Sequence, residues 1–142
     1  MTMAISEMRA RAWSRGAVLV VAGSALVVAL AGLALMGFRR DYVGHLLVGY
    51  GIAVLAASGW RRGGGAPIAG LAAAVICGFA FEFNELGARD AHDLAWTVVG
   101  GSVAATLWVT VDGLPHRRAS IVGAVCVVVA LVIRYTPGPG LP

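Results

Sequence analysis

Five apolar stretches follow one another along this chain, with little sequence left between them. They are residues 17–38, 42–59, 66–86, 94–111 and 119–135. A helix needs about 20 mostly apolar residues to cross a bilayer, and each stretch has roughly that length. Only 13% of the 142 residues are charged and 59% are hydrophobic, whereas soluble domains carry about 25% charged residues. The sequence therefore predicts an all-α integral membrane protein, a compact bundle of about five transmembrane helices.

The expected domain organisation has three parts. An N-terminal arm (1–16) precedes the five-helix domain (17–135), and a flexible tail (136–142) with three prolines follows it. Arg9, Arg11 and Arg15 precede the first apolar stretch, as the basic residues of a signal peptide would, and Ala29-Leu30-Ala31 imitates a cleavage site. The stretch is longer than the 7–15 apolar residues or so that are typical of a signal peptide, so we expect an uncleaved helix.

The basic residues favour one orientation in the membrane. All eleven are arginines, in short clusters between the apolar stretches, a pattern typical of topology signals and not of nucleic-acid binding. One side would carry seven of them: Arg9, Arg11, Arg15, Arg61, Arg62, Arg117 and Arg118. The other side would carry four: Arg39, Arg40, Arg89 and Arg134. The positive-inside rule then predicts a multi-pass protein of the inner or plasma membrane, with a cytoplasmic N-terminus and an extracytoplasmic C-terminus.

Small residues are frequent inside the apolar stretches and predict close helix packing. Cys77 and Cys126 lie inside these stretches without a CxxC spacing, so we interpret them as small packing residues.

Polar residues gather at the predicted outer ends of the second, third and fourth helices. The candidate ligand-binding residues are Asp41, His45, Glu82, Glu85, Arg89, Asp90 and Asp93. Asp41 and His45 are four residues apart and share one face of a helix. Glycines such as Gly49 and Gly100 would form the floor of a shallow pocket between these ends.

Most of these residues also have a structural interpretation. Asp41 and Asp90 suit helix N-termini, and the arginines could extend toward lipid headgroups. Glu82 fits this interpretation poorly, because it lies near a helix C-terminus and between phenylalanines. A charged side chain at the bilayer centre costs about 2.5–3.5 kcal/mol on insertion scales, and less near the edge, so Glu82 needs a partner, a proton or a function.

Three motifs in order resemble the VanZ-like membrane proteins, or a related uncharacterised bacterial inner-membrane family. Residues 41–49 (DYVGHLLVG) resemble the D-x-x-x-H opening of the second VanZ-like helix, and Glu82 matches an acid near the end of the third. Residues 89–100 (RDAHDLAWTVVG) are similar to the R-x-x-D-x-x-D-x-x-x-N-x-x-G signature, with Thr97 in the place of the asparagine and Arg89 directly before Asp90. The resemblance implies a membrane location and a polar site. VanZ-like proteins are associated with glycopeptide resistance, but the resemblance implies no reaction.

Two functions are compatible with this pattern. The first is a non-catalytic binder or accessory protein for a lipid or cell-envelope headgroup, with anionic lipid, an envelope precursor or a glycopeptide as ligand and arginines to pair with phosphate. The alternative is a metal-assisted hydrolase or transferase for lipid-linked envelope substrates, with His45, Glu82 and Asp93 as candidate catalytic residues and zinc ligands. A proton- or ion-conducting role is a third hypothesis. The sequence leaves open whether the protein is an enzyme, and it does not predict an oligomeric state.

Overall fold

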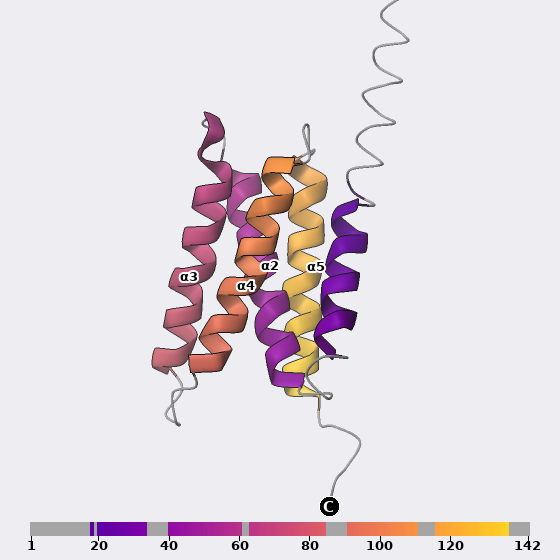
Figure 1. Cartoon of the computed structure of the whole chain (residues 1–142), viewed down its shortest axis with the longest axis vertical. Helices are drawn as coiled ribbons and strands as arrows, with labels where there is room; N and C mark the ends of the chain where they lie inside the picture. Colours follow the sequence, from indigo (N-terminus) through magenta and orange to yellow (C-terminus); the bar gives the residue numbers. More distant parts are fainter. Residues whose placement is uncertain are drawn as a thin grey trace, which may run out of the picture.

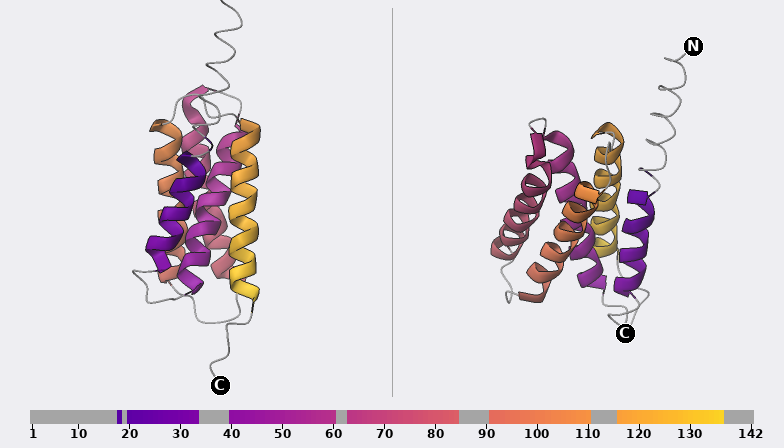
Figure 2. Two further views of the ribbon diagram at one scale, coloured as in Figure 1. Left: turned by 90° about the vertical axis from the view of Figure 1, so that its right-hand side faces the viewer. Right: turned by 45° about the horizontal axis from the view of Figure 1, so that its top comes forward.

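The computed structural model describes Val18 and residues 20–33, 40–60, 63–84, 91–110 and 116–136. These residues form five α-helices and no strand, which confirms the predicted all-helical architecture. The helices are Val20–Leu33, α2 (Arg40–Gly59), α3 (Ala66–Asn84), α4 (Ala91–Thr110) and α5 (His116–Tyr135), with a short 3-10 turn η1 (Gly63–Gly65) before α3. They stand side by side and alternate in direction, so consecutive helices are antiparallel (Figures 1 and 2).

The ends of the helices follow local chemistry. α4 begins at Ala91, three residues before the apolar stretch, because an acid such as Asp93 in the first turn interacts favourably with the helix dipole. α3 has Pro67 in its first turn, where a missing N–H costs nothing. α5 ends at Tyr135, two residues before Pro137, with Arg134 in its last turn. The predicted arm (1–16) and residues 137–142 of the tail lie outside the described residues.

The central helix of the bundle is α2, which packs against α3, α4 and α5. The helix Val20–Leu33 packs on it too, since the Tyr50 hydroxyl donates to the carbonyl of Val21 over 3.2 Å. Most residues of α2 from Val43 to Ser58 are buried. Cys126 lies in the same core, in agreement with its interpretation as a packing residue.

Glycines bring α2 and α4 together backbone to backbone. A Cβ atom on Gly100 would overlap the carbonyl of Leu46, and one on Gly49 would overlap the carbonyl of Thr97. Neither glycine lines the cavity described below, so the expectation that they form a pocket floor is wrong. The backbone of the neighbouring helix occupies the space beside each glycine. This contact fixes the position of Thr97 relative to α2.

The outer surface of the bundle is apolar between its two ends. Large apolar side chains exposed on it include Leu26, Val27, Leu30, Ile68, Ile76, Phe79, Val99, Val109, Ile121, Val125, Val128 and Val132. Among the described residues, every Asp, Glu and Arg lies within three residues of a helix end. Two helices, α2 and α5, are long and apolar enough to cross a membrane; α2 is mostly buried by its neighbours, and α5 is mostly exposed.

Candidate functional site

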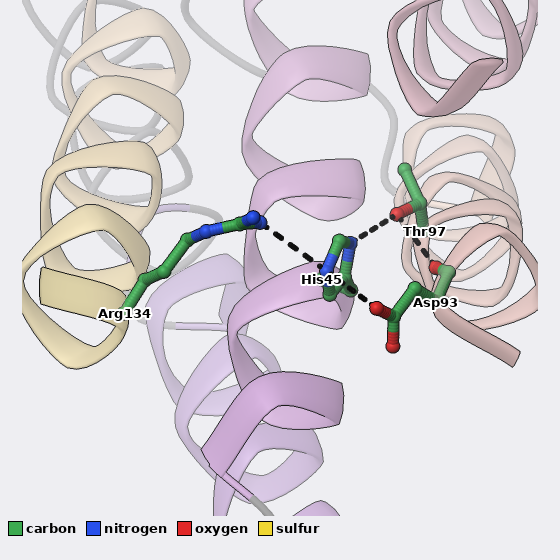
Figure 3. A network of polar contacts seen from close by, with 4 residues as sticks. All are labelled: His45, Asp93, Thr97 and Arg134. Atoms are coloured by element: carbon green, nitrogen blue, oxygen red, sulfur yellow. Dashed lines mark hydrogen bonds and ion pairs between the residues drawn. The ribbon is translucent and has the colours of Figure 1, made fainter. Parts of the chain in front are cut away.

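Four helix ends meet at one end of the bundle, the lower end in Figure 1. They are the starts of α2 and α4 and the ends of α3 and α5. α2 contributes His45, α3 contributes Glu82, α4 contributes Asp93 and Thr97, and α5 contributes Arg134. Two of these helices, α4 and α5, bring polar side chains directly onto His45 (Figure 3).

His45 is buried, with 8% of its surface exposed, and its two ring nitrogens have different partners. Nδ1 lies 3.3 Å from the Thr97 hydroxyl, and that hydroxyl donates its hydrogen to the backbone carbonyl of Asp93 over 3.0 Å. A hydroxyl has one hydrogen, so Thr97 accepts from His45 and the hydrogen is on Nδ1. The Thr97 bond thus turns Nε2 toward the other polar side chains.

Nε2 of His45 lies between an acid and a base. Oδ2 of Asp93 is 3.3 Å away and Nη1 of Arg134 is 3.4 Å away, from α4 and α5 respectively (Figure 3). With the hydrogen of the neutral ring on Nδ1, Nε2 carries a lone pair and faces the carboxylate, which also carries only lone pairs. Two such acceptors this close need positive charge beside them, either a proton on Nε2 or a cation. Arg134 supplies one cation by donating to Nε2.

Glu82 completes a group that could hold a metal ion. One ligand atom each from His45, Glu82 and Asp93 lies within 4.8 Å of the other two. Both acids are partly buried, which separates this group from a solvated acidic surface. The three residues are those that the sequence predicted as metal ligands, and imidazole and carboxylate are both ligand types that zinc binds.

A cavity of about 840 Å³ opens beside this group. The polar residues that line it are Arg40, Asp41, His45, Asp93, Arg134, Tyr135 and Thr136. The other lining residues are Gly44, Val48, Phe81, Ala130, Leu131 and Ile133. The small residues that give it room are therefore Gly44 and Ala130, on α2 and α5.

The structure brings four of the seven predicted site residues together. Asp41 and His45 line the same cavity with Asp93, as their spacing on a shared face predicted, and Glu82 joins His45 and Asp93 from α3. The other three predicted residues are Glu85, Arg89 and Asp90, and they lie outside the described residues.

The sequence-based site lacked Arg134, and it named Thr97 only as the residue in the place of the asparagine of the motif. Arg134 lines the cavity and contacts His45 from a helix that carried no predicted site residue. The direction of the chain could have predicted this position of Arg134. In a bundle whose five helices alternate in direction, the fifth helix ends at the end of the bundle where the second begins. Thr97 lies one turn after Asp93, and this spacing lets its hydroxyl reach back to the carbonyl of Asp93.

The two other histidines have separate surroundings. The ring of His92 stacks with that of Tyr42, at a centroid separation of 6.2 Å, on the outside of the site end. His116 lies at the other end of the bundle, where Nδ1 is 3.0 Å from the carbonyl of Ser58. Within the described residues, His45 is thus the histidine that joins two acids.

Comparison with protein-family models, curated proteins and solved structures finds no match for this chain.

Proposed function

We propose that this chain is a multi-pass membrane protein that binds an anionic, phosphate-bearing lipid headgroup at one face of the membrane. The apolar outer surface supports the membrane part of the proposal. A soluble bundle presents charged side chains on its outer faces, whereas here the charged residues that the structure describes lie at the helix ends. A belt of exposed valine, leucine and isoleucine between two polar ends suits a bilayer.

The cavity carries the headgroup part of the proposal. Two arginines, Arg40 and Arg134, line it together with apolar side chains, so it can receive a charged group and the first carbons of an acyl chain. Guanidinium groups pair well with phosphate oxygens, often through two parallel hydrogen bonds. Since the cavity lies at the end of the helices, a headgroup can enter from the membrane plane.

Lipid retention tests this proposal. The full-length protein would be purified in mild detergent, offered phosphatidylglycerol and phosphatidylcholine in equal amounts, and examined by native mass spectrometry. We expect the wild type to prefer phosphatidylglycerol and the double variant Arg40→Gln/Arg134→Gln to lose the preference. The matched control is Arg117→Gln/Arg118→Gln, which removes the same charge at the opposite end. If both double variants retain phosphatidylglycerol as the wild type does, the headgroup proposal is wrong.

A second candidate function, metal-assisted hydrolysis or group transfer on a lipid-linked substrate, is favoured by the His45, Glu82 and Asp93 group. A zinc ion held there would polarise a phosphoryl oxygen or activate water beside the bound headgroup. Release of a soluble headgroup from a lipid by the purified zinc-loaded protein, absent in Glu82→Gln, would favour catalysis over simple binding.

We also propose the orientation and the family relation that the sequence suggests. The arginine distribution supports a cytoplasmic N-terminus, with the site on the extracytoplasmic side. The three motifs, whose His45, Glu82 and Asp93 belong to one group, support a relation to VanZ-like proteins.

A further inference from the structure

We propose that His45, Glu82 and Asp93 form a zinc site. In the absence of zinc, the Arg134 guanidinium donates to Nε2 of His45, and zinc displaces it when it binds. The proposal goes beyond headgroup binding and does not depend on it. It rests on the zinc group of the second candidate function and adds that Arg134 competes with the ion for Nε2 of His45.

The hydrogen bonds of His45 support the ligand geometry. A histidine ligand usually donates its second N–H to a fixed acceptor, which orients the ring and leaves the other nitrogen for the metal. Here Nδ1 donates to the Thr97 hydroxyl, which is itself fixed by its bond to the carbonyl of Asp93. The close contact between α2 and α4 holds that hydroxyl in place, since Gly49 packs on the backbone of Thr97.

The spacing of the donors also suits zinc. With zinc–ligand bonds of about 2.0–2.2 Å, tetrahedral donors lie about 3.3–3.5 Å apart. The observed distance from Nε2 of His45 to Oδ2 of Asp93 is 3.3 Å. A carboxylate oxygen of Glu82 lies within 4.8 Å of a ligand atom of each of the other two residues, so Glu82 would have to move closer to bind the same ion.

The charges of the group also suit a divalent ion. Two ionised carboxylates neutralise one divalent cation, and a cation between them lowers the cost of holding their charges near apolar residues. Glu82 is flanked by Phe81 and Phe83 in the sequence.

Arg134 and zinc exclude each other at Nε2. The nitrogen has one lone pair, and Nη1 of Arg134 lies 3.4 Å from it. Arg134 lines the cavity and is exposed, so its side chain has room to leave. Removal of its charge should therefore strengthen zinc binding, whereas loss of a residue with a merely structural role would weaken binding or leave it unchanged.

The test measures zinc affinity by competition with a chromophoric chelator, on full-length protein in nanodiscs of neutral phosphatidylcholine. We expect about one zinc ion per chain, and binding about tenfold tighter in Arg134→Gln, which loses a nearby like charge. Arg117→Gln is the matched control, because Arg117 is an exposed arginine at the opposite end of the same helix. We expect its zinc affinity to stay within about twofold of the wild type, since distant exposed charges are screened.

Two further variants test the ligands and their positioning. We expect Glu82→Gln, which removes one ligand, to weaken zinc binding by about 100-fold or more. Thr97→Val should weaken binding by about 10–100-fold, as changes next to metal ligands do, and Thr97→Ser should restore most of it.

Two results would overturn the proposal. A helical, monodisperse wild type that takes up no stoichiometric zinc would exclude the site. Equal or weaker zinc binding in Arg134→Gln would exclude the displacement by zinc. Because the nanodiscs contain no anionic lipid, either result would leave headgroup binding to be judged by its own experiment.

Discussion

The two ends of the bundle each place a histidine between helices, and they use it differently. At the far end, His116 of α5 reaches the carbonyl of Ser58 near the end of α2 and lies against the ring of Trp108. At the site end, His45 donates to a side-chain hydroxyl and directs its second nitrogen at an acid and a guanidinium. The hydrogen bond from His116 satisfies a backbone carbonyl near a helix end, which is a structural role. The acid, the base and the cavity around His45 together can bind a ligand.

If the proposed membrane-spanning bundle is correct, the two ends lie on opposite sides of a membrane, and this is the prediction with the largest effect. Ala91 is exposed at the site end, and Gly59, which has open space around it, lies at the far end. In a background without the native cysteines, we expect Ala91→Cys to react with a membrane-impermeant maleimide in intact cells. Gly59→Cys should react only after the cells are permeabilised. The reverse pattern would invert the orientation, and labelling of both in intact cells would contradict a membrane-spanning bundle.

The close contact of α2 and α4 should be the most sensitive structural feature of the site end. In Gly100→Ala the new methyl group would overlap the carbonyl of Leu46, next to His45, so the helices must separate. Overpacking costs about 1–3 kcal/mol, and we expect the upper part of this range because the obstacle is backbone. Gly23→Ala is the control, because no atom outside its own helix lies within 4 Å of that position. Unfolding in bicelles measures both, and equal stability of the two variants would rule out this packing account.

The same substitution at the two histidines should separate ligand binding from stability. We expect His45→Ala to abolish zinc binding in the chelator competition. His116→Ala should retain it and lose only about 1 kcal/mol of unfolding free energy, since it removes one hydrogen bond to a backbone carbonyl. Loss of zinc binding in both variants would mean that the two ends do not differ in the way that their contacts suggest.

The sequence was most informative where hydrophobic length decides the structure. The apolar stretches predicted an all-helical chain, and α2 ends at Gly59 as expected. The apolar stretch alone placed the start of α4 at residue 94, because Ala91, His92 and Asp93 have no apolar periodicity. The structural interpretation of Asp90 as an N-terminal residue was the better guide, since α4 begins at Ala91. Capping and dipole effects set such ends, and they act over single residues.

The site was predictable in part for a physical reason. An acid near a helix C-terminus inside an apolar sequence needs partners, and this led from Glu82 to His45 and Asp93. The contribution of α5 was not predictable in the same way, because Arg134 suits a last helical turn and gave no sign of a second role. The sequence did not show which glycines leave room for a ligand. Gly49 and Gly100 were expected to line a pocket, but the neighbouring helix packs against them, and Gly44 lines the cavity instead.

Zinc X-ray absorption spectroscopy on protein loaded with one equivalent of zinc tests most directly whether the converging side chains form a site. Zinc–nitrogen and zinc–oxygen bonds are about 2.0–2.2 Å long, whereas zinc–sulfur bonds are about 2.3 Å. We predict a first shell of nitrogen and oxygen only, with the outer-shell signal of one imidazole, and loss of that signal in His45→Ala. A sulfur shell, which would place the ion at Cys77 or Cys126, or an imidazole signal that persists in His45→Ala, would contradict the account.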